Sequence, residues 1–206
     1  MKNNQTKQKV VDAASMLFFQ KGFHGTSVRD IASRASVNVS LISYYFNSKQ
    51  GLLEYAVTNY FEMYLNRLED VLESNRSLNE IEKLKKIINA VIEYKTDHFQ
   101  LTSFIHRELS LDSTFVREMT VTYLAKENYI ISTLFLTILS EQEKLQQPYL
   151  YMQLKGMIMS PFILQHEWKN QLLDTQARKN FIKMHTESIN KWLQFVAFYS
   201  KSKQLS

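Results

Sequence analysis

The sequence predicts an all-α protein in which a small N-terminal domain of three helices precedes a larger helical bundle. Three observations support this prediction. Only 4 glycines and 2 prolines occur among 206 residues, too few for the frequent turns of a β-sandwich or barrel. Hydrophobic residues make up 45% of the chain, enough for a sizeable core. Apolar residues recur at helical intervals in about nine segments, which predicts as many helices.

The first fifty residues contain three short helical segments. The first, 7–21, has one apolar stripe and ends at Gly22, where a left-handed cap is favoured. Ser27 and Asp30 form a capping box that starts the second segment. A polar break separates it from the third segment, 38–46. Helix, tight turn and short helix is the order in which a helix-turn-helix presents its second helix to the major groove, although a fragment of any helical bundle would show the same pattern.

Basic residues concentrate in the same part of the chain. Residues 1–50 contain 7 Lys and Arg against 2 Asp, a net charge of +5 that equals the formal charge of the whole protein. Residues 51–206 carry 18 basic and 18 acidic side chains and are neutral. A basic end on a neutral body indicates a small anion-binding module, while a chance fluctuation of surface charge is the alternative.

A family resemblance rests on three pieces of sequence: KGFHGTSVRDIA from Lys21, the single Val37, and ISYYFNSKQGL from Ile42. Together they resemble the N-terminal domain of TetR-type transcriptional regulators over roughly residues 7–54. The resemblance implies a homodimeric repressor that binds an inverted repeat of double-stranded DNA. It also implies a domain 1–47 for DNA binding and a helical domain 48–206 for regulation and dimerisation.

Matched position by position, the resemblance assigns DNA contacts to eight residues. It places Thr26 and Ser27 on phosphates, Val39, Ser40 and Ser43 on base edges, and Tyr44, Tyr45 and Lys49 on the backbone. The sequence departs from the family at three positions. Ser43 stands where the family usually has Tyr, Tyr45 stands where it commonly has His, and Asn47 stands where Lys or Arg is frequent. Because the groove-facing set is poor in bidentate donors, we expect sequence preference to depend on hydroxyl and apolar contacts and on DNA shape.

A second resemblance is to the RefZ-like subgroup of endospore formers, which act on cell division from chromosomal sites. It rests on Val37-Asn38-Val39, Ile42-Ser43-Tyr44-Tyr45-Phe46 and Gly51-Leu52-Leu53-Glu54. The alternative function that it implies is a division regulator that works through a protein partner.

Residues 51–206 show helical periodicity without catalytic motifs. There is no cysteine, no glycine-rich phosphate loop and no His-Glu-x-x-His spacing, so we expect neither an enzyme nor a bound metal or cofactor. No apolar run approaches the ~18 residues of a membrane span, so a cytoplasmic, nucleoid-associated protein is expected. One predicted helix, Tyr149–Trp168, contains Pro161 and should kink there.

The body also offers candidates for effector binding and for dimerisation. Residues that mix aromatic, thioether and polar edges, as in an effector cavity, are His98, His106, Tyr123, Met152 and Trp168. The same residue types would also pack a core. Long apolar faces on the last two helices indicate a dimer seam, with packing within the chain as the alternative; these faces contain Tyr151, Leu154, Ile158, Phe162 and Leu164, then Phe181, His185, Ile189, Trp192 and Phe195.

Overall fold

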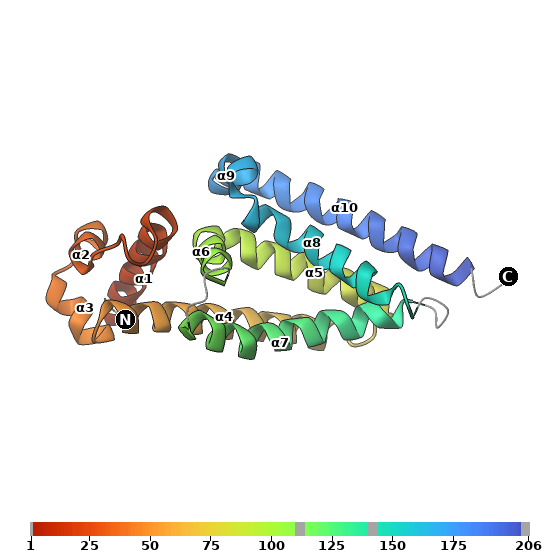
Figure 1. Ribbon diagram of the computed structural model, residues 1–206, viewed down its shortest axis with the longest axis horizontal. Coiled ribbons are helices and arrows are strands. Elements are labelled where there is room, and N and C mark those ends of the chain that lie inside the picture. Colours follow the sequence, from red (N-terminus) through yellow and green to blue (C-terminus); the bar gives the residue numbers. More distant parts are fainter. Residues whose placement is uncertain (1, 110–113, 140–143, 203–206) are drawn as a thin grey trace. The chain divides into compact units, whose positions relative to one another are not determined.

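The structure, a computed structural model, describes residues 2–109, 114–139 and 144–202, which form ten α-helices and no β-strand (Figure 1). The all-α prediction is confirmed. The helices are α1 (Lys2–Lys21), α2 (Val28–Ala35), α3 (Val39–Phe46), α4 (Lys49–Ser74), α5 (Glu80–Asp97), α6 (Phe99–Leu109), α7 (Thr114–Thr137), α8 (Gln147–Ile163), α9 (Gln165–Leu173) and α10 (Thr175–Ser202).

The chain divides into two compact units. The first consists of Met1–Met63 and Gln100–Met119, and the second of Tyr64–Phe99 and Thr120–Ser206. Most of α6 therefore belongs to the same unit as the three N-terminal helices, although about fifty residues separate them in the sequence. The predicted boundary between residues 47 and 48 divides the chain by expected role and stays a prediction.

The core of the first unit is built on the apolar stripe of α1. Val10, Ala14 and Phe18 are fully buried, as the helical spacing predicts. The Phe18 ring stacks on Phe104 of α6 with centroids 5.4 Å apart. Such aromatic pairs add about 0.5–1.5 kcal/mol to the free energy that area burial already contributes. Their contact fixes α1 against α6.

The core of the second unit is formed by helices α5, α8 and α10. Three of its fully buried side chains are Ile87, Ile88 and Val91, which lie on one face of α5. Half of the residues on the apolar faces predicted to form a dimer seam are buried here within the chain, namely Leu154, Ile158, Phe162, Phe181 and Ile189. Of the other predicted seam residues, Leu164 is 49% and Phe195 67% exposed, so burial within the chain covers only part of these faces. The dimer seam stays a prediction.

Pro161 has a stronger effect than the predicted kink. The expected helix Tyr149–Trp168 is two helices, α8 and α9, separated at Leu164 with φ −87° and ψ 52°. Proline offers no backbone N–H to the helical ladder and its ring crowds the carbonyl four residues earlier. The helix continues for less than one turn beyond Pro161 and then restarts, which accounts for ten helices where about nine were predicted. Among the described residues, none of the helices is both long and apolar enough to span a membrane.

Candidate nucleic-acid interface

The start of α2 is fixed by the predicted capping box. The Ser27 hydroxyl accepts from the amide of Asp30 at 3.1 Å, and the Asp30 carboxylate accepts from the amide of Ser27 at 3.2 Å. The hydrogen bonds from the Ser27 backbone and side chain, followed by the charge of Lys21, hold the pKa of Asp30 below its ordinary value. Two orphan amides are thereby satisfied, and Ser27 stays exposed at the helix N-terminus.

Thr26 and Lys49 both have partners inside the first unit. Thr26 is 1% exposed, and its hydroxyl lies 2.8 Å from the Gly22 carbonyl. The Lys49 ammonium donates to the carbonyls of Phe23 and Thr26, both at 2.8 Å, and lies 4.4 Å from the centroid of the Phe23 ring. Both side chains therefore stabilise the connection between α1 and α2 by hydrogen bonding to its backbone carbonyls. The DNA contacts assigned to them from the resemblance stay predictions.

Helix α3 is capped at its start by Asn38. The Asn38 side-chain oxygen accepts from the Ser40 amide at 2.9 Å and from the Ser40 hydroxyl at 2.8 Å. In front of it, Ser36 adopts the left-handed region at φ 54°, and the amide of Val37 bonds back to the Ala32 carbonyl at 3.0 Å. This tight turn confirms the predicted break and fixes how α3 leaves α2.

The two faces of α3 differ sharply. Ile42 and Phe46 are buried, as their spacing predicts. Val39 is 40% and Tyr44 77% exposed. Helical periodicity alone does not decide whether Val39 faces the core, and the structure places it outside the core. The predicted base-reading residues Val39, Ser40 and Ser43 are all exposed, and Tyr45 is half-buried. The structure brings these residues and Tyr44 together on one eight-residue helix.

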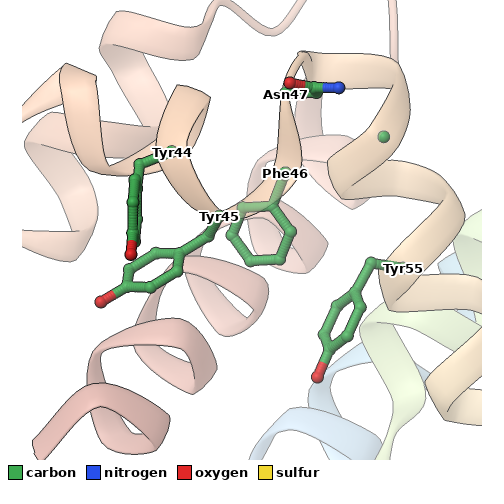
Figure 2. A pocket seen from close by; sticks show the side chains of 6 residues that line it. Tyr44, Tyr45, Phe46, Asn47 and Tyr55 are labelled. Atoms are coloured by element: carbon green, nitrogen blue, oxygen red, sulfur yellow. The ribbon is translucent and has the colours of Figure 1, made fainter.

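A hollow of about 410 Å³ lies where α3 passes into α4, and Figure 2 shows its aromatic side chains. It is lined by Tyr44, Tyr45, Phe46, Asn47, Gly51 and Tyr55. Ser48 caps α4 by accepting from the Gly51 amide at 3.0 Å. A side chain at Gly51 would overlap the Phe46 carbonyl, so glycine is required for α4 to start this close to α3.

Arg107 is a residue that sequence reasoning missed. From α6 it donates to the carbonyls of Phe18 at 2.8 Å and Phe19 at 3.1 Å, in the last turn of α1. The Phe18 carbonyl also accepts from the Gly22 amide at 2.9 Å, so the guanidinium is a second donor to it. The positive charge also complements the negative end of the helix dipole. Its spacing from α1 along the chain, close to ninety residues, gives no sequence signal.

The five predicted effector residues do not converge on one site. His98 stacks on Tyr94 with centroids 4.2 Å apart, and Trp168 packs on Phe181 at 5.5 Å. Met152 is 63% exposed and lines a surface hollow of about 480 Å³ on α8. Tyr123 is half-buried, and His106 belongs to the first unit, whereas the other four belong to the second. Their role in effector binding stays a prediction.

The described residues bring no three His, Asp or Glu side chains into a group that could hold a metal ion.

Known proteins are similar to this chain in both sequence and fold. A family profile described as "Bacterial regulatory proteins, tetR family" matches residues 10–56. The probable HTH-type transcriptional regulator YttP of Bacillus subtilis is 40% identical over 198 residues, covering 93% of each chain. The chain belongs to the TetR family. A second relative is IcaR of Staphylococcus aureus, the negative transcriptional regulator of the biofilm operon icaADBC, which is 33% identical over 82 residues, 40% of this chain and 43% of IcaR.

A solved structure of a putative fatty acid metabolism regulator from Clostridium perfringens has the same fold. Its TM-score is 0.67 at 21% identity, with 89% of this chain and 97% of that chain covered. As a TetR-family protein, this chain is a DNA-binding transcriptional regulator and not an enzyme. Its helix-turn-helix is formed by α2 and α3.

Proposed function

We propose that the protein is a homodimeric repressor that places one α3 helix per protomer in successive major grooves of an inverted-repeat site. The observation that supports this proposal is the exposed face of α3, which carries Val39, Ser40 and Ser43 on a helix capped by Asn38. Because the cap and the turn at Ser36 fix the helix rigidly, little ordering entropy is left to lose when DNA binds.

Ser40 reads a base as a hydrogen-bond acceptor in this proposal. Its hydroxyl donates its proton to the Asn38 side chain, so the hydroxyl oxygen can only accept a hydrogen bond from a base. Major-groove donors are the N4 amino group of cytosine and the N6 amino group of adenine. Val39 adds an apolar contact of the kind that suits a thymine methyl group.

In this proposal, residues on either side of the exposed face of α3 contact the DNA phosphates. Tyr44 and Tyr45 offer phenol hydroxyls beside α3, and Ser27 lies at the N-terminus of α2, where backbone amides favour an anion. Thr26 and Lys49 act indirectly, because their polar atoms hold the carbonyls of the connection in front of α2. These contacts position the protein and carry no base information.

Dimerisation is supported by apolar side chains that the second unit leaves exposed. On α10, Phe195 is 67% and Phe198 75% exposed, and on α8 Met152 is 63% exposed. Contiguous exposed apolar patches mark interaction surfaces, and in this proposal these side chains form such a patch on each protomer. Phe198→Arg should yield monomers in size-exclusion chromatography with light scattering. Val121→Arg places the same charge at another exposed position, on α7, and should leave the dimer intact.

A small effector that releases the repressor would have to bind the DNA-free state more tightly than the DNA-bound state. The second unit, with the α8 hollow around Met152, is the proposed place.

Genome-wide mapping of bound DNA in the native host tests the proposal. A repressor gives an inverted-repeat motif close to promoters, and the genes there are derepressed on deletion. Ser40→Ala and Ser43→Ala should relax the motif at their own positions, and an unchanged motif contradicts their base-reading role. Sites scattered along the chromosome without transcriptional effect favour the RefZ-like alternative of a division regulator with a protein partner.

A further inference from the structure

Four aromatic rings form a row that runs from α3 to α4. Ring centroids are 5.2 Å apart for Tyr44 and Tyr45, 6.1 Å for Tyr45 and Phe46, and 5.3 Å for Phe46 and Tyr55. Figure 2 shows the rings following one another along the hollow of about 410 Å³. Tyr44 and Tyr45 are the residues proposed to touch the DNA backbone, so this row of rings begins at the DNA surface.

Lys7 of α1 lies against the two rings that follow Tyr45 in this row, those of Phe46 and Tyr55. Its ammonium is 3.8 Å from the centroid of the Tyr55 ring and 5.6 Å from that of Phe46. The negative faces of the two rings attract the cation and restrict where the flexible side chain can go. Among the described residues, no carboxylate lies within ion-pair distance of Lys7, so its charge is not neutralised there by the chain.

Three other cations near the helix-turn-helix each have a partner within the chain. The Lys49 ammonium is bonded to two backbone carbonyls. Lys21 faces Asp30 at 3.9 Å, and Arg34 is directed at the sulfur of Met16. Lys7, by contrast, lies on the rings of Phe46 and Tyr55, and among the described residues no carboxylate or carbonyl binds its ammonium.

We propose that Lys7 binds a phosphate of the DNA backbone next to the contacts of Tyr44 and Tyr45, and that Phe46 and Tyr55 hold its ammonium in place for this. The proposal rests on the DNA-binding surface proposed above. An ammonium on a compact, flexible stem suits a single phosphate oxygen as a point charge, and pre-ordering on aromatic rings reduces the entropy lost on binding. In this assignment Lys49 is a positioning residue.

Salt dependence separates a phosphate contact from a structural role. The probe is a random-sequence 30-base-pair duplex, whose binding depends on counterion release, titrated between 50 and 200 mM salt. Lys7→Gln should lower the slope of log K against log salt by about 0.9 per bound protomer. The wild type then loses about threefold more affinity per protomer than the variant over this range. Lys9→Gln, an exposed lysine of the same helix, should keep a larger slope than Lys7→Gln.

Lys49→Gln should keep the wild-type slope while weakening binding through the altered α1–α2 connection. A slope that falls in Lys49→Gln and not in Lys7→Gln reverses the assignment. Equal slopes for wild type and Lys7→Gln overturn the proposal, and the proposed surface of α3 is judged separately by Ser40→Ala and Ser43→Ala.

Tyr55→Leu tests the aromatic support, because it keeps an apolar contact with Phe46 and removes the ring under the ammonium. Binding should weaken about two- to fivefold. Unchanged affinity contradicts the role of the rings. Circular dichroism melting of each variant shows whether the fold is retained, and the slope remains interpretable for any variant that melts like the wild type.

Discussion

The imidazole of His185 donates from Nε2 to the backbone carbonyl of Met157 across 3.0 Å. That carbonyl lies four residues before Pro161, which has no N–H with which to complete the helical ladder. A histidine on α10 therefore supplies the donor that proline removes from α8. Burial lowers the pKa of His185, and the bond to Met157 opposes this only in part. The neutral imidazole is the form that the native protein retains.

Stability should consequently depend on pH through His185. Because its native pKa lies below its ordinary value of 6.5, the unfolded chain binds more protons than the native chain once pH falls below about 7. The free energy of unfolding should be independent of this group above that pH and fall as the pH decreases towards 5. Urea midpoints between pH 5 and 8 measure the effect.

The control for this experiment is His185→Gln, whose amide donates a hydrogen bond without titrating. Its urea midpoint should vary less with pH than that of the wild type in the same interval. Two parallel pH profiles would show that other groups produce the dependence.

Arg107 should matter for the stability of the DNA-binding helices. Arg107→Ala removes two hydrogen bonds to the last turn of α1, at Phe18 and Phe19. Bonds from a charged donor contribute about 1.5–3 kcal/mol, and the lower end applies because 36% of this side chain is exposed. Amide exchange in the last turn of α1 should accelerate by about tenfold, which is the rate equivalent of about 1.4 kcal/mol.

Arg107→Lys provides the matched variant, since an ammonium can reach one carbonyl in place of two. Its amide exchange should fall between those of Arg107→Ala and the wild type. Exchange in α1 that is equal in all three proteins would mean that the two bonds contribute nothing to the stability of this turn.

Gly51→Ala should disrupt the junction between α3 and α4. The added methyl group would overlap the carbonyl of Phe46, a backbone atom that cannot swing aside. We expect a lower melting temperature and weaker binding to any duplex, because the exposed face of α3 is displaced. Gly156→Ala adds the same group where no atom lies within 4 Å, and it should stabilise α8 by about 0.5–1 kcal/mol. Similar melting of both variants would contradict the steric argument.

Helix positions and caps could be predicted because they depend on neighbours three or four residues away. The capping box of Ser27 and Asp30, the left-handed Gly22 and the cap at Asn38 all follow from local sequence, and the structure contains each of them. Family motifs located the exposed face of α3 in the same way.

Partners of individual side chains could not be predicted from the same information. Lys49 and Arg107 look like surface cations in the sequence, but both bind backbone carbonyls contributed by distant residues. Likewise, periodicity identifies which face of α8 or α10 is apolar but not whether its own chain or a second copy covers that face. Leu154 and Ile158 are covered within the chain, whereas Phe198 is not.

A buried ion pair on α5 and α7 leads to a further prediction. The Lys95 ammonium lies 3.0 Å from the Glu127 carboxylate, with side chains only 1% and 2% exposed. The ring of Tyr64 lies 4.9 Å from the same ammonium. Burial, and then the charge of Glu127, raise the pKa of Tyr151 to about 12, so the phenol beside this pair stays neutral.

Desolvation of two charges offsets most of their attraction, so this pair should matter chiefly when it is broken on one side. Lys95→Met strands a buried carboxylate and should cost about 3–5 kcal/mol of unfolding free energy, and Glu127→Leu should cost a similar amount. The double variant removes both charges and should recover most of the loss, reaching or exceeding wild-type stability. Urea denaturation of the four proteins completes a double-mutant cycle. Additive losses would show that the two side chains do not interact energetically, despite lying 3.0 Å apart.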